Sequence, residues 1–367
     1  MMEWIASAAF GLEGLVKREL QALGLETTMD QGGVRFIGGT DTAFRANLEL
    51  RTADRVQLIV GEGEARSFEE LFQLISAIAW EDYIPRGGSF PVTGQCGRSQ
   101  LMSVRDVQAI SKKAVAERLK QRYKMNWLDE SKESYGIHVA IHQDKVRVTL
   151  DASGNALNRR GYRTWNGEAP LRETLAAALV DLSPWVPGRP LHDPCCGTGT
   201  ILVKAAFKRA KRAPGLVRPF SMENWHFADK KQCDEIRREA RFRFNPDLIE
   251  GISGSDVDPE ALELCKKHLA QAGLKDRIPV FEKDLRDLEP LSANTCVITN
   301  PPYGERLGSK KDADTLYRQM RKLETKAMAR NVCILTSSPS FERLYGKRAQ
   351  RKRRLYNGRL ECEYLIF

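Results

Sequence analysis

The sequence predicts an α/β fold, in which a doubly wound, mostly parallel sheet with a terminal antiparallel hairpin follows a smaller α+β module. From Gly161 onward, short apolar strands alternate with helices, as in sheets covered on both faces. A glycine-rich turn joins the first of these strands to its helix. Near the end of the chain, Asn357-Gly358 separates two strand-like runs and is typical of a type I′ hairpin turn.

Length and composition limit the classes of protein. A chain of 367 residues exceeds one ordinary core, so we expect two or three domains. No apolar run approaches the roughly 20 residues that span a bilayer, and the segment from Met1 to Phe10 lacks the basic start of a secretory leader. We therefore expect a cytoplasmic protein with no membrane association and no obligate protein partner.

Charge and cysteine usage point to a polyanionic partner and to reduced thiols. The net charge of +10 favours phosphate-rich partners, because phosphate contacts release counterions. The eight cysteines form neither a C-x-x-C pair nor a Cys/His cluster at zinc spacing. We expect them to be buried and reduced, with no bound metal.

The first region, residues 1–65, alternates strands and helices in the order β-α-β-α-β, which predicts a small α+β subdomain. Apolar residues recur at helical spacing before Gly24, which is placed as a C-terminal cap. The predicted strands are Trp4–Phe10, Gly32–Ile37 and Val56–Val60, and the predicted helices are Leu12–Leu23 and Asp41–Leu50.

The second region, residues 66–155, predicts another α+β unit with a basic helix. Between Arg98 and Lys124 stand eight basic residues and only two acids, Asp106 and Glu117. This stretch either meets phosphates or forms a solvated helix face. The predicted helices are Phe68–Ala79 and Arg105–Tyr123, and the predicted strands are Ser89–Cys96, Gly136–Gln143 and Lys145–Asp151.

The third region, residues 160–367, carries a glycine motif after the strand at Leu191. Its glycines let the backbone approach a ligand closely, and the helix that follows offers free N–H groups. The spacing is neither that of a P-loop nor that of a dinucleotide fingerprint. An aspartate followed by G-x-G suits the ammonium and carboxylate groups of an amino-acid tail. The candidate binding residues are Asp193, Pro194, Gly197, Thr198, Gly199 and Thr200.

Two later strands also end near carboxylates. Asp256 follows an apolar strand, where a carboxylate is placed to hold ribose hydroxyls. Asp258 either joins it or caps the helix that begins at Pro259. Asp284 follows the next strand and either contacts an adenine amino group or serves as a loop or cap residue.

The most specific motif is Asn300-Pro301-Pro302-Tyr303, directly after the apolar strand Cys296–Thr299. The two prolines fix the backbone, so that the Asn300 amide oxygen and the Pro301 carbonyl can face one pocket. Both accept hydrogen bonds, and an exocyclic amino group has two protons to donate. Tyr303 offers a ring on which an extracted base can stack. We predict that these four residues hold an amine that attacks an electrophilic methyl group.

In their order along the chain, these motifs resemble those of S-adenosylmethionine-dependent amino-group methyltransferases with the Rossmann-like class I fold. The segments Asp151–Gly154, Arg160–Arg163 and Ala169–Thr174 are similar to those of THUMP-domain RNA guanine-N2 methyltransferases. The match extends over the whole chain to the methylating amino-terminal half of the bacterial 23S ribosomal RNA enzymes. Residues 1–65 resemble their ferredoxin-like leader, and residues 66–155 their THUMP RNA-binding domain.

This resemblance implies a methyltransferase that uses S-adenosylmethionine and acts on structured RNA, ribosomal RNA first and transfer RNA second. The main chain at Gly197 and Gly199 would hold the methionine part of the cofactor, Asp256 the ribose and Asp284 the adenine. The cofactor entrance would be lined by Arg163, Pro170 and Thr174. The basic run from Arg343 to Arg359 would protect a sheet edge or contribute to RNA binding.

Several alternatives stay open at this point. Asn-Pro-Pro-Tyr is shared with adenine-N6 DNA methyltransferases, so it does not separate guanine from adenine. The same domain arrangement serves transfer RNA methyltransferases. A non-catalytic RNA-binding assembly factor with a relic cofactor fold is a further candidate, whereas the glycine spacing disfavours a nicotinamide oxidoreductase. The length of the chain predicts one methyltransferase domain rather than a fused enzyme with two activities.

Overall fold

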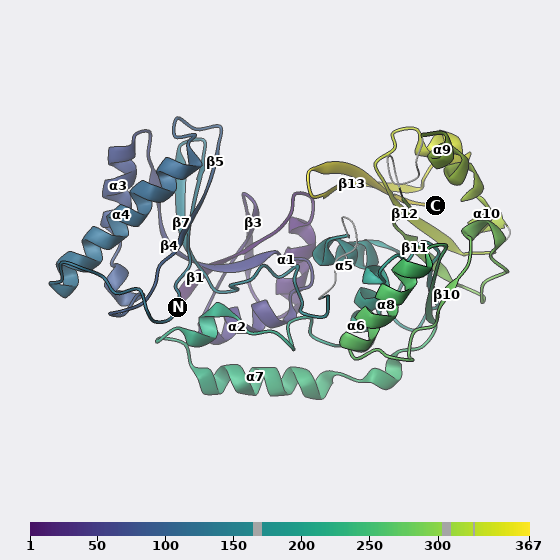
Figure 1. Ribbon diagram of the computed structural model, residues 1–367, viewed down its shortest axis with the longest axis horizontal. Helices are drawn as coiled ribbons and strands as arrows, with labels where there is room; N and C mark the ends of the chain where they lie inside the picture. Colours follow the sequence, from purple (N-terminus) through teal and green to yellow (C-terminus); the bar gives the residue numbers. More distant parts are fainter. Residues whose placement is uncertain (164–170, 303–309, 326) are drawn as a thin grey trace. The chain divides into compact units, whose positions relative to one another are not determined.

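The computed structural model describes residues 1–163, 171–302, 310–325 and 327–367. Two compact units form, and the chain passes between them several times along the sequence (Figure 1). Unit 1 comprises residues 1–8, 16–157 and 218–238, and unit 2 comprises residues 9–15, 158–217 and 239–367. Each unit is built on its own seven-stranded sheet.

The sheet of unit 1 has the strand order β2-β3-β1-β4-β7-β6-β5. Its strands are β1 (Met2–Ser7), β2 (Thr27–Asp30), β3 (Gly33–Gly38), β4 (Arg55–Glu64), β5 (Val92–Gly97), β6 (Ile137–His142) and β7 (Lys145–Asp151). Neighbouring strands are antiparallel except β5 and β6, which run parallel. Because β4 pairs with both β1 and β7, the first two predicted regions share one sheet.

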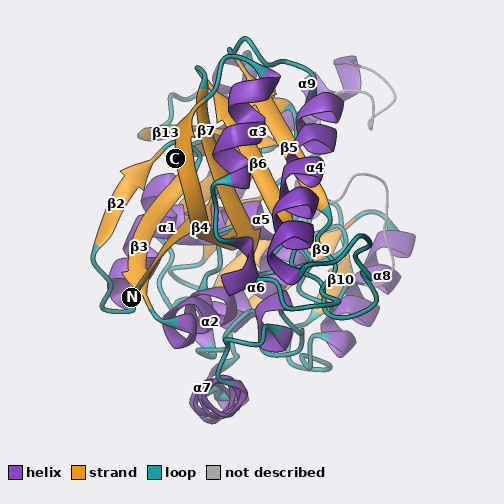
Figure 2. Ribbon diagram, turned by 90° about the vertical axis from the view of Figure 1, so that its left-hand side faces the viewer, coloured by secondary structure: helices purple, strands orange, loops and turns teal. Residues whose placement is uncertain are grey.

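Helices α3 and α4 lie together on one face of this sheet (Figure 2). Each begins at a serine whose hydroxyl accepts a main-chain N–H of the first turn, Ser67 for α3 and Ser103 for α4. In α4, Val107, Ala114 and Leu119 are buried, which leaves the basic side chains at the surface. The helices of this part of the chain are α1 (Glu13–Ala22), α2 (Thr40–Glu49), α3 (Phe68–Ser76) and α4 (Val104–Tyr123).

In unit 1, one predicted strand is too long and one strand was not predicted. The strand predicted over Trp4–Phe10 ends at Ser7, and residues 9–15 belong to unit 2. Strand β2 was not predicted, because Thr27–Asp30 contains a single large apolar residue, Met29. As an edge strand with both faces accessible, it needs no apolar alternation.

The segment 218–238 lies in the third region of the sequence but packs within unit 1. Trp225 anchors it, because its ring stacks on Trp4 with centroids 6.4 Å apart and on Tyr135 at 6.3 Å. All three rings are buried. A single tryptophan in an insertion gives no periodic signal, so the sequence did not reveal this packing.

The sheet of unit 2 has the order β10-β9-β8-β11-β12-β14-β13. Its first five strands are parallel, and β14 runs antiparallel to both β12 and β13. The strands are β8 (Leu191–Asp193), β9 (Ile252–Asp256), β10 (Val280–Glu282), β11 (Cys296–Thr299), β12 (Asn331–Thr336), β13 (Arg351–Asn357) and β14 (Leu360–Ile366). The predicted parallel sheet with a terminal antiparallel hairpin is therefore confirmed.

Helices cover both faces of this sheet, as in doubly wound folds. On one face α9, α10 and α11 enclose an apolar cluster with Val297, Val332 and Leu365. On the other face, the Tyr364 hydroxyl donates to the Leu179 carbonyl of α5 at 2.9 Å. The helices of unit 2 are α5 (Glu173–Leu182), α6 (Thr200–Arg209), α8 (Pro259–Gln271), α9 (Lys310–Gln319), α10 (Lys322–Thr325) and α11 (Phe341–Tyr345). Helix α7 (Lys230–Arg243) belongs to both units, because unit 1 ends within it at Arg238.

The hairpin turn differs from the predicted type I′. Asn357 pairs with Leu360, so the two loop residues are Gly358 and Arg359. Of these only Gly358 has a positive φ, 68°. A positive φ at the first loop residue alone is the type II′ pattern, and glycine is the residue that adopts it without strain.

None of the eight cysteines, all of which are described, forms a disulfide, and six of them are buried. Within the described ranges, no helix combines the length and the apolarity needed to cross a membrane.

Candidate active site

The four sequence motifs meet at one edge of the unit 2 sheet. Parallel strands present their carboxyl ends at the same edge, and Asp193, Asp256 and Asn300 stand at the ends of β8, β9 and β11. A cleft of about 860 Å³ opens there. Its wall includes residues from every motif: Asp193, Pro194, Gly197, Thr198, Thr200, Asp256, Asp258, Asp284, Asn300 and Pro302.

The glycine motif forms a tight loop between β8 and α6. Gly197 and Gly199 have φ values of 50° and 80°, and Gly199 is the cap residue directly before α6. The Gly199 N–H donates to the Cys196 carbonyl at 2.8 Å. The first turn of α6, at Thr200, therefore faces the cleft with N–H groups that a carboxylate can use.

Asp193 is a buried carboxyl that faces this cleft. It is 1% exposed, and one of its oxygens accepts the Cys195 N–H at 3.2 Å. Burial raises the pKa of Asp193 to about 7, and the nearby Asp256 adds to this shift. A cation in the cleft would stabilise the ionised form, so the site suits an ammonium group.

Asp256 and Asp258 have different surroundings. Asp256 accepts the Gly197 N–H at 2.7 Å and the Asp258 N–H at 3.1 Å, which ties β9 to the glycine loop. Burial raises the pKa of Asp256. Asp258 uses one oxygen to cap α8, accepting the N–H groups of Glu260 and Ala261. Capping is thus the observed contact of Asp258, although its side chain also reaches the cleft wall.

Asp284 is both a cap and a member of an ion pair. Its side chain accepts the Arg286 N–H at 2.8 Å, which begins a short 3₁₀ helix, Leu285–Asp287. The Arg286 guanidinium pairs with the same carboxylate and lowers the pKa of Asp284. Both residues line the cleft, so a ligand that contacts Asp284 would share it with Arg286.

Asn300 holds an unused acceptor at the cleft. Its side-chain oxygen Oδ1 is buried, and among the described residues no donor reaches it. Buried polar atoms are nearly always paired, and Asn300 is a residue of the cleft wall, so a ligand group is the partner that we expect for this oxygen. The Tyr317 hydroxyl donates to the Pro302 carbonyl at 3.4 Å, which links the Asn300–Pro302 segment to α9. Pro301 is buried. Tyr303 lies outside the described residues.

Two of the three residues expected at the cofactor entrance, Arg163 and Thr174, are described. Arg163 donates to the Leu171 carbonyl at 3.0 Å, and Thr174 is buried in the first turn of α5. Neither belongs to the described cleft wall, whereas Leu171 between them does. Pro170 lies outside the described residues.

The sequence reasoning missed one side of the cleft, which α9 provides through Asp312, Thr315 and Leu316. The apolar residues Ala313, Tyr317 and Met320 recur at helical spacing and are buried. That periodicity was the available signal for the helix. It indicates which face of α9 packs inward, but it does not reveal that the neighbouring polar face borders a ligand cleft.

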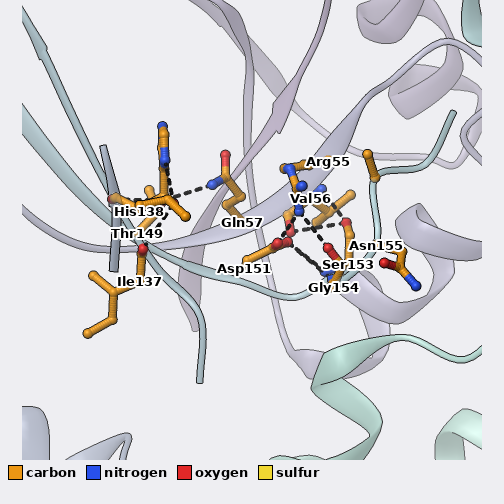
Figure 3. Close-up of polar contacts among 12 residues, drawn as sticks. Arg55, Val56, Gln57, Ile137, His138, Thr149, Asp151, Ser153, Gly154 and Asn155 are labelled. Carbon is orange, nitrogen blue, oxygen red and sulfur yellow. Dashed lines mark hydrogen bonds and ion pairs between the residues drawn. The ribbon is translucent and has the colours of Figure 1, made fainter. Parts of the chain in front are cut away.

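In unit 1, a row of polar contacts crosses β4, β7 and β6 (Figure 3). Gln57 donates to the Thr149 hydroxyl at 3.1 Å. Arg55 pairs with Asp151 and donates to the Gly154 carbonyl at 2.6 Å. Asp151 also accepts the N–H groups of Ser153 and Gly154. These contacts fix the segment 151–154, one of those on which the family resemblance rests.

Of the basic residues on and around α4, some form ion pairs and others do not. Four of its eight basic residues pair with carboxylates: Lys112, Lys113, Arg118 and Arg122. Arg98, Arg105 and Lys124 are exposed and have no ion pair among the described residues. These three are the members most available for phosphates.

Comparison with known families matches nearly the whole chain. Residues 3–57 match the RlmL ferredoxin-like domain, and residues 65–151 match the THUMP domain. Residues 160–366 match the family described as RMKL-like, methyltransferase domain.

Two curated relatives match this chain over nearly its whole length. "Putative RNA methyltransferase YpsC" of Bacillus subtilis is 41% identical over 362 residues, which cover 98% of this chain and 94% of the relative. "Ribosomal RNA large subunit methyltransferase K/L" of Syntrophotalea carbinolica is 33% identical over 100% of this chain, which spans 53% of that protein.

Two solved structures match the chain over its full length. One, from Listeria monocytogenes, is described as "a predicted N6-adenine-specific DNA methylase"; it is 40% identical with a TM-score of 0.93, and 96% of it is covered. The other, SMU.472, "a putative methyltransferase complexed with SAH", is 38% identical with a TM-score of 0.94, and 97% of it is covered.

Proposed function

Since the chain belongs to the RlmK/L-like family of S-adenosylmethionine-dependent RNA methyltransferases with a THUMP domain, we propose that it methylates the exocyclic N2 of a guanosine in 23S ribosomal RNA. The observation that carries the proposal is the unpartnered Oδ1 of Asn300 in the cleft at the strand ends. An amino group on a base is the donor that this acceptor fits.

The residues of the cleft fit the cofactor. The N-terminus of α6 and the loop at Gly197 and Gly199 would hold its carboxylate, and Asp193 its ammonium group. Asp256 would accept the ribose hydroxyls, and Asp284 the adenine amino group. When bound, the cofactor supplies an electrophilic methyl group on a positively charged sulfur.

The chain's own residues orient the amine. Asn300 Oδ1 and the Pro301 carbonyl would accept the two N–H bonds of the target amino group, which aims the nitrogen lone pair at the methyl carbon. When the N–C bond forms at the expense of the S–C bond, positive charge would develop on the nitrogen, and the two oxygens would stabilise it. The methylated amine would then lose a proton to solvent. Tyr303 would stack on the base after it leaves its helix.

The choice of guanine and of ribosomal RNA rests on the family. The THUMP domain favours RNA over DNA, and the name of the Syntrophotalea relative specifies the large ribosomal RNA. The description of the Listeria structure names adenine and DNA instead, and the Asn-Pro-Pro-Tyr motif fits both bases. Adenine-N6 methylation, transfer RNA as substrate and a non-catalytic assembly factor are therefore the outcomes that a test must separate.

The test compares substrates directly. Purified protein is incubated with labelled cofactor and either unmodified 23S ribosomal RNA, unmodified transfer RNA or duplex DNA, and the nucleosides are identified by mass spectrometry. We expect N2-methylguanosine from 23S RNA alone. N6-methyladenosine would overturn the base assignment, and label in transfer RNA would overturn the substrate. A protein that binds no cofactor at millimolar concentration would be the relic factor.

The pKa of Asp193 makes cofactor affinity depend on pH. Below pH 7 the free protein carries a neutral Asp193, which must lose its proton before it can pair with the ammonium group. Affinity should therefore fall by about 25-fold from pH 7.5 to pH 5.5 and level off above pH 8. Asp256, whose pKa is raised by burial, adds to the fall in the same direction.

Isothermal titration calorimetry across this pH range measures the effect, and Asp193→Asn is the matched control. The variant should bind more weakly at pH 7.5 and keep only a shallow pH dependence. His192 does not account for the fall, because burial lowers its pKa to about 4. Equal affinities of the wild-type protein at pH 5.5 and 7.5 would contradict the role given to Asp193.

A further inference from the structure

The tip of the hairpin β13–β14 exposes apolar and aromatic surface. Phe10 is 69% exposed and Leu360 is 44% exposed, while Tyr356 is half-buried. The rings of Phe10 and Tyr356 meet edge to face, with centroids 5.7 Å apart. A single exposed apolar residue is common on protein surfaces, whereas two rings in contact form a larger apolar surface that a partner can cover.

Phe10 is held at this place by the backbone that follows it. Residues 9–15 belong to unit 2, although the strand before them belongs to unit 1. Gly11 has a φ of 88°, and a Cβ atom there would lie 3.0 Å from the Arg354 carbonyl oxygen and 3.7 Å from Leu355. Only glycine allows this close approach, so the segment lies against β13 beside the hairpin (Figure 1).

The hairpin that carries Tyr356 is rich in basic residues, and the Tyr356 hydroxyl itself donates to Glu361 at 3.1 Å. Arg359, in the turn, is exposed and has no ion pair among the described residues. Arg351 and Arg353 are also exposed without an ion pair there, but they project from the face of β13 opposite to Tyr356. Lys352 and Arg354 pair with Glu342 and Glu361 but stay largely accessible. Protection of the sheet edge explains the arginines but not an exposed phenylalanine. Aromatic rings set among cations are the combination that binds single-stranded nucleic acid.

The sheet register relates this tip to Asn300. Thr299 pairs with Ile334, so Asn300 is level with Leu335 on β12. Leu335 pairs with Tyr364 on β14, and Tyr364 pairs with Arg353 on β13. Arg353 is therefore level with Asn300 across the sheet. Strand β13 runs parallel to β11, and Tyr356 is three residues beyond Arg353 on it. At roughly 3.3 Å per residue, Tyr356 lies about 10 Å further along the strand direction than Asn300. Strand β13 is three strands from β11, or about 14 Å. The tip therefore rises from the edge that carries the cleft.

We propose that Phe10 and Tyr356 form a second RNA subsite, which stacks on a base of the substrate near the target nucleotide. This rests on the proposed function, since it places another part of the same RNA on unit 2. The separation of about 17 Å from Asn300 corresponds to about five stacked nucleotides at the rise of 3.4 Å. A single-stranded segment fits, because its bases are free to stack on the protein.

Two assays test the subsite with the full-length chain. Fluorescence anisotropy measures binding of a fluorescein-labelled, mixed-sequence single-stranded RNA at low salt, and steady-state kinetics measures KM for unmodified 23S ribosomal RNA. Phe10→Ala and Tyr356→Ala should each weaken oligonucleotide binding and raise KM by about 5- to 100-fold, with a smaller effect on kcat. Tyr356→Phe, which keeps the ring, should restore both values.

Phe242→Ala is the control, because Phe242 is a 93% exposed phenylalanine on α7, away from the hairpin in sequence, and should leave both assays unchanged. Equal oligonucleotide affinities for wild type and both alanine variants, or no binding by the wild type, would overturn the subsite. Failure of the proposed function is a separate result, because a different methylated nucleoside leaves the oligonucleotide comparison intact. Thermal melting checks that each variant folds.

Discussion

Replacing Asn300 with alanine is expected to slow methyl transfer by about 10²- to 10³-fold, while cofactor affinity stays within about twofold of the wild type. The side-chain oxygen is buried at the cleft and has no donor among the described residues. Its removal therefore breaks no described hydrogen bond of the fold. What is lost is an acceptor for the amine, whose contribution grows as the nitrogen becomes positive in the transition state.

Single-turnover transfer from labelled cofactor measures this rate, and calorimetry measures cofactor binding. Asn331→Ala is a matched control, since Asn331 begins the neighbouring strand β12 at the opposite edge of the sheet, where it accepts a hydrogen bond from Arg189 at 3.3 Å. That variant should keep wild-type turnover. If Asn300→Ala also kept turnover within tenfold, the role of Asn300 in holding the amine would be wrong.

The sequence predicted the strand ends of unit 2 because strands buried on both faces leave an unambiguous apolar signal. The run Cys296–Thr299 and residues 332–336 are mostly apolar and buried, and the polar residues that follow them mark the edge of the sheet. Once these ends are located, the parallel order brings Asp193, Asp256 and Asn300 to one cleft. It could therefore be predicted from the sequence that residues of the four motifs line one cleft.

Other features depend on contacts that no local pattern encodes. Arg286 reaches the cleft through its ion pair with Asp284, and α9 closes one side of it from a separate part of the chain. Residues 9–15 pack in unit 2, although the residues on both sides of them in the sequence belong to unit 1. Residues 218–238 pack in unit 1, although the residues on both sides of them belong to unit 2. The pKa of Asp193 depends on complete burial, which is a property of the packed unit rather than of the motif.

Gly199→Ala is expected to lower the stability of unit 2 by about 2–5 kcal/mol and to weaken cofactor binding. Two costs combine at this position. The φ of 80° places an L-residue in the left-handed region, which costs roughly 1–2 kcal/mol. An added Cβ would also lie 2.5 Å from the buried Cys265 thiol of α8, and such overpacking costs about 1–3 kcal/mol. Chemical denaturation measures stability, and calorimetry measures cofactor affinity.

Two further variants, one at Gly197 and one at Cys265, separate the backbone cost from the packing cost. Gly197 also has a positive φ, 50°, but a Cβ there meets nothing within 4 Å, so Gly197→Ala should cost only the backbone term of about 1–2 kcal/mol. In the double variant Gly199→Ala with Cys265→Ala, removal of the sulfur should relieve the clash and recover stability relative to Gly199→Ala. Strict additivity of the two substitutions would show that the glycine does not pack against Cys265. Recovery of both stability and cofactor affinity would establish that α8 positions the glycine loop through this contact.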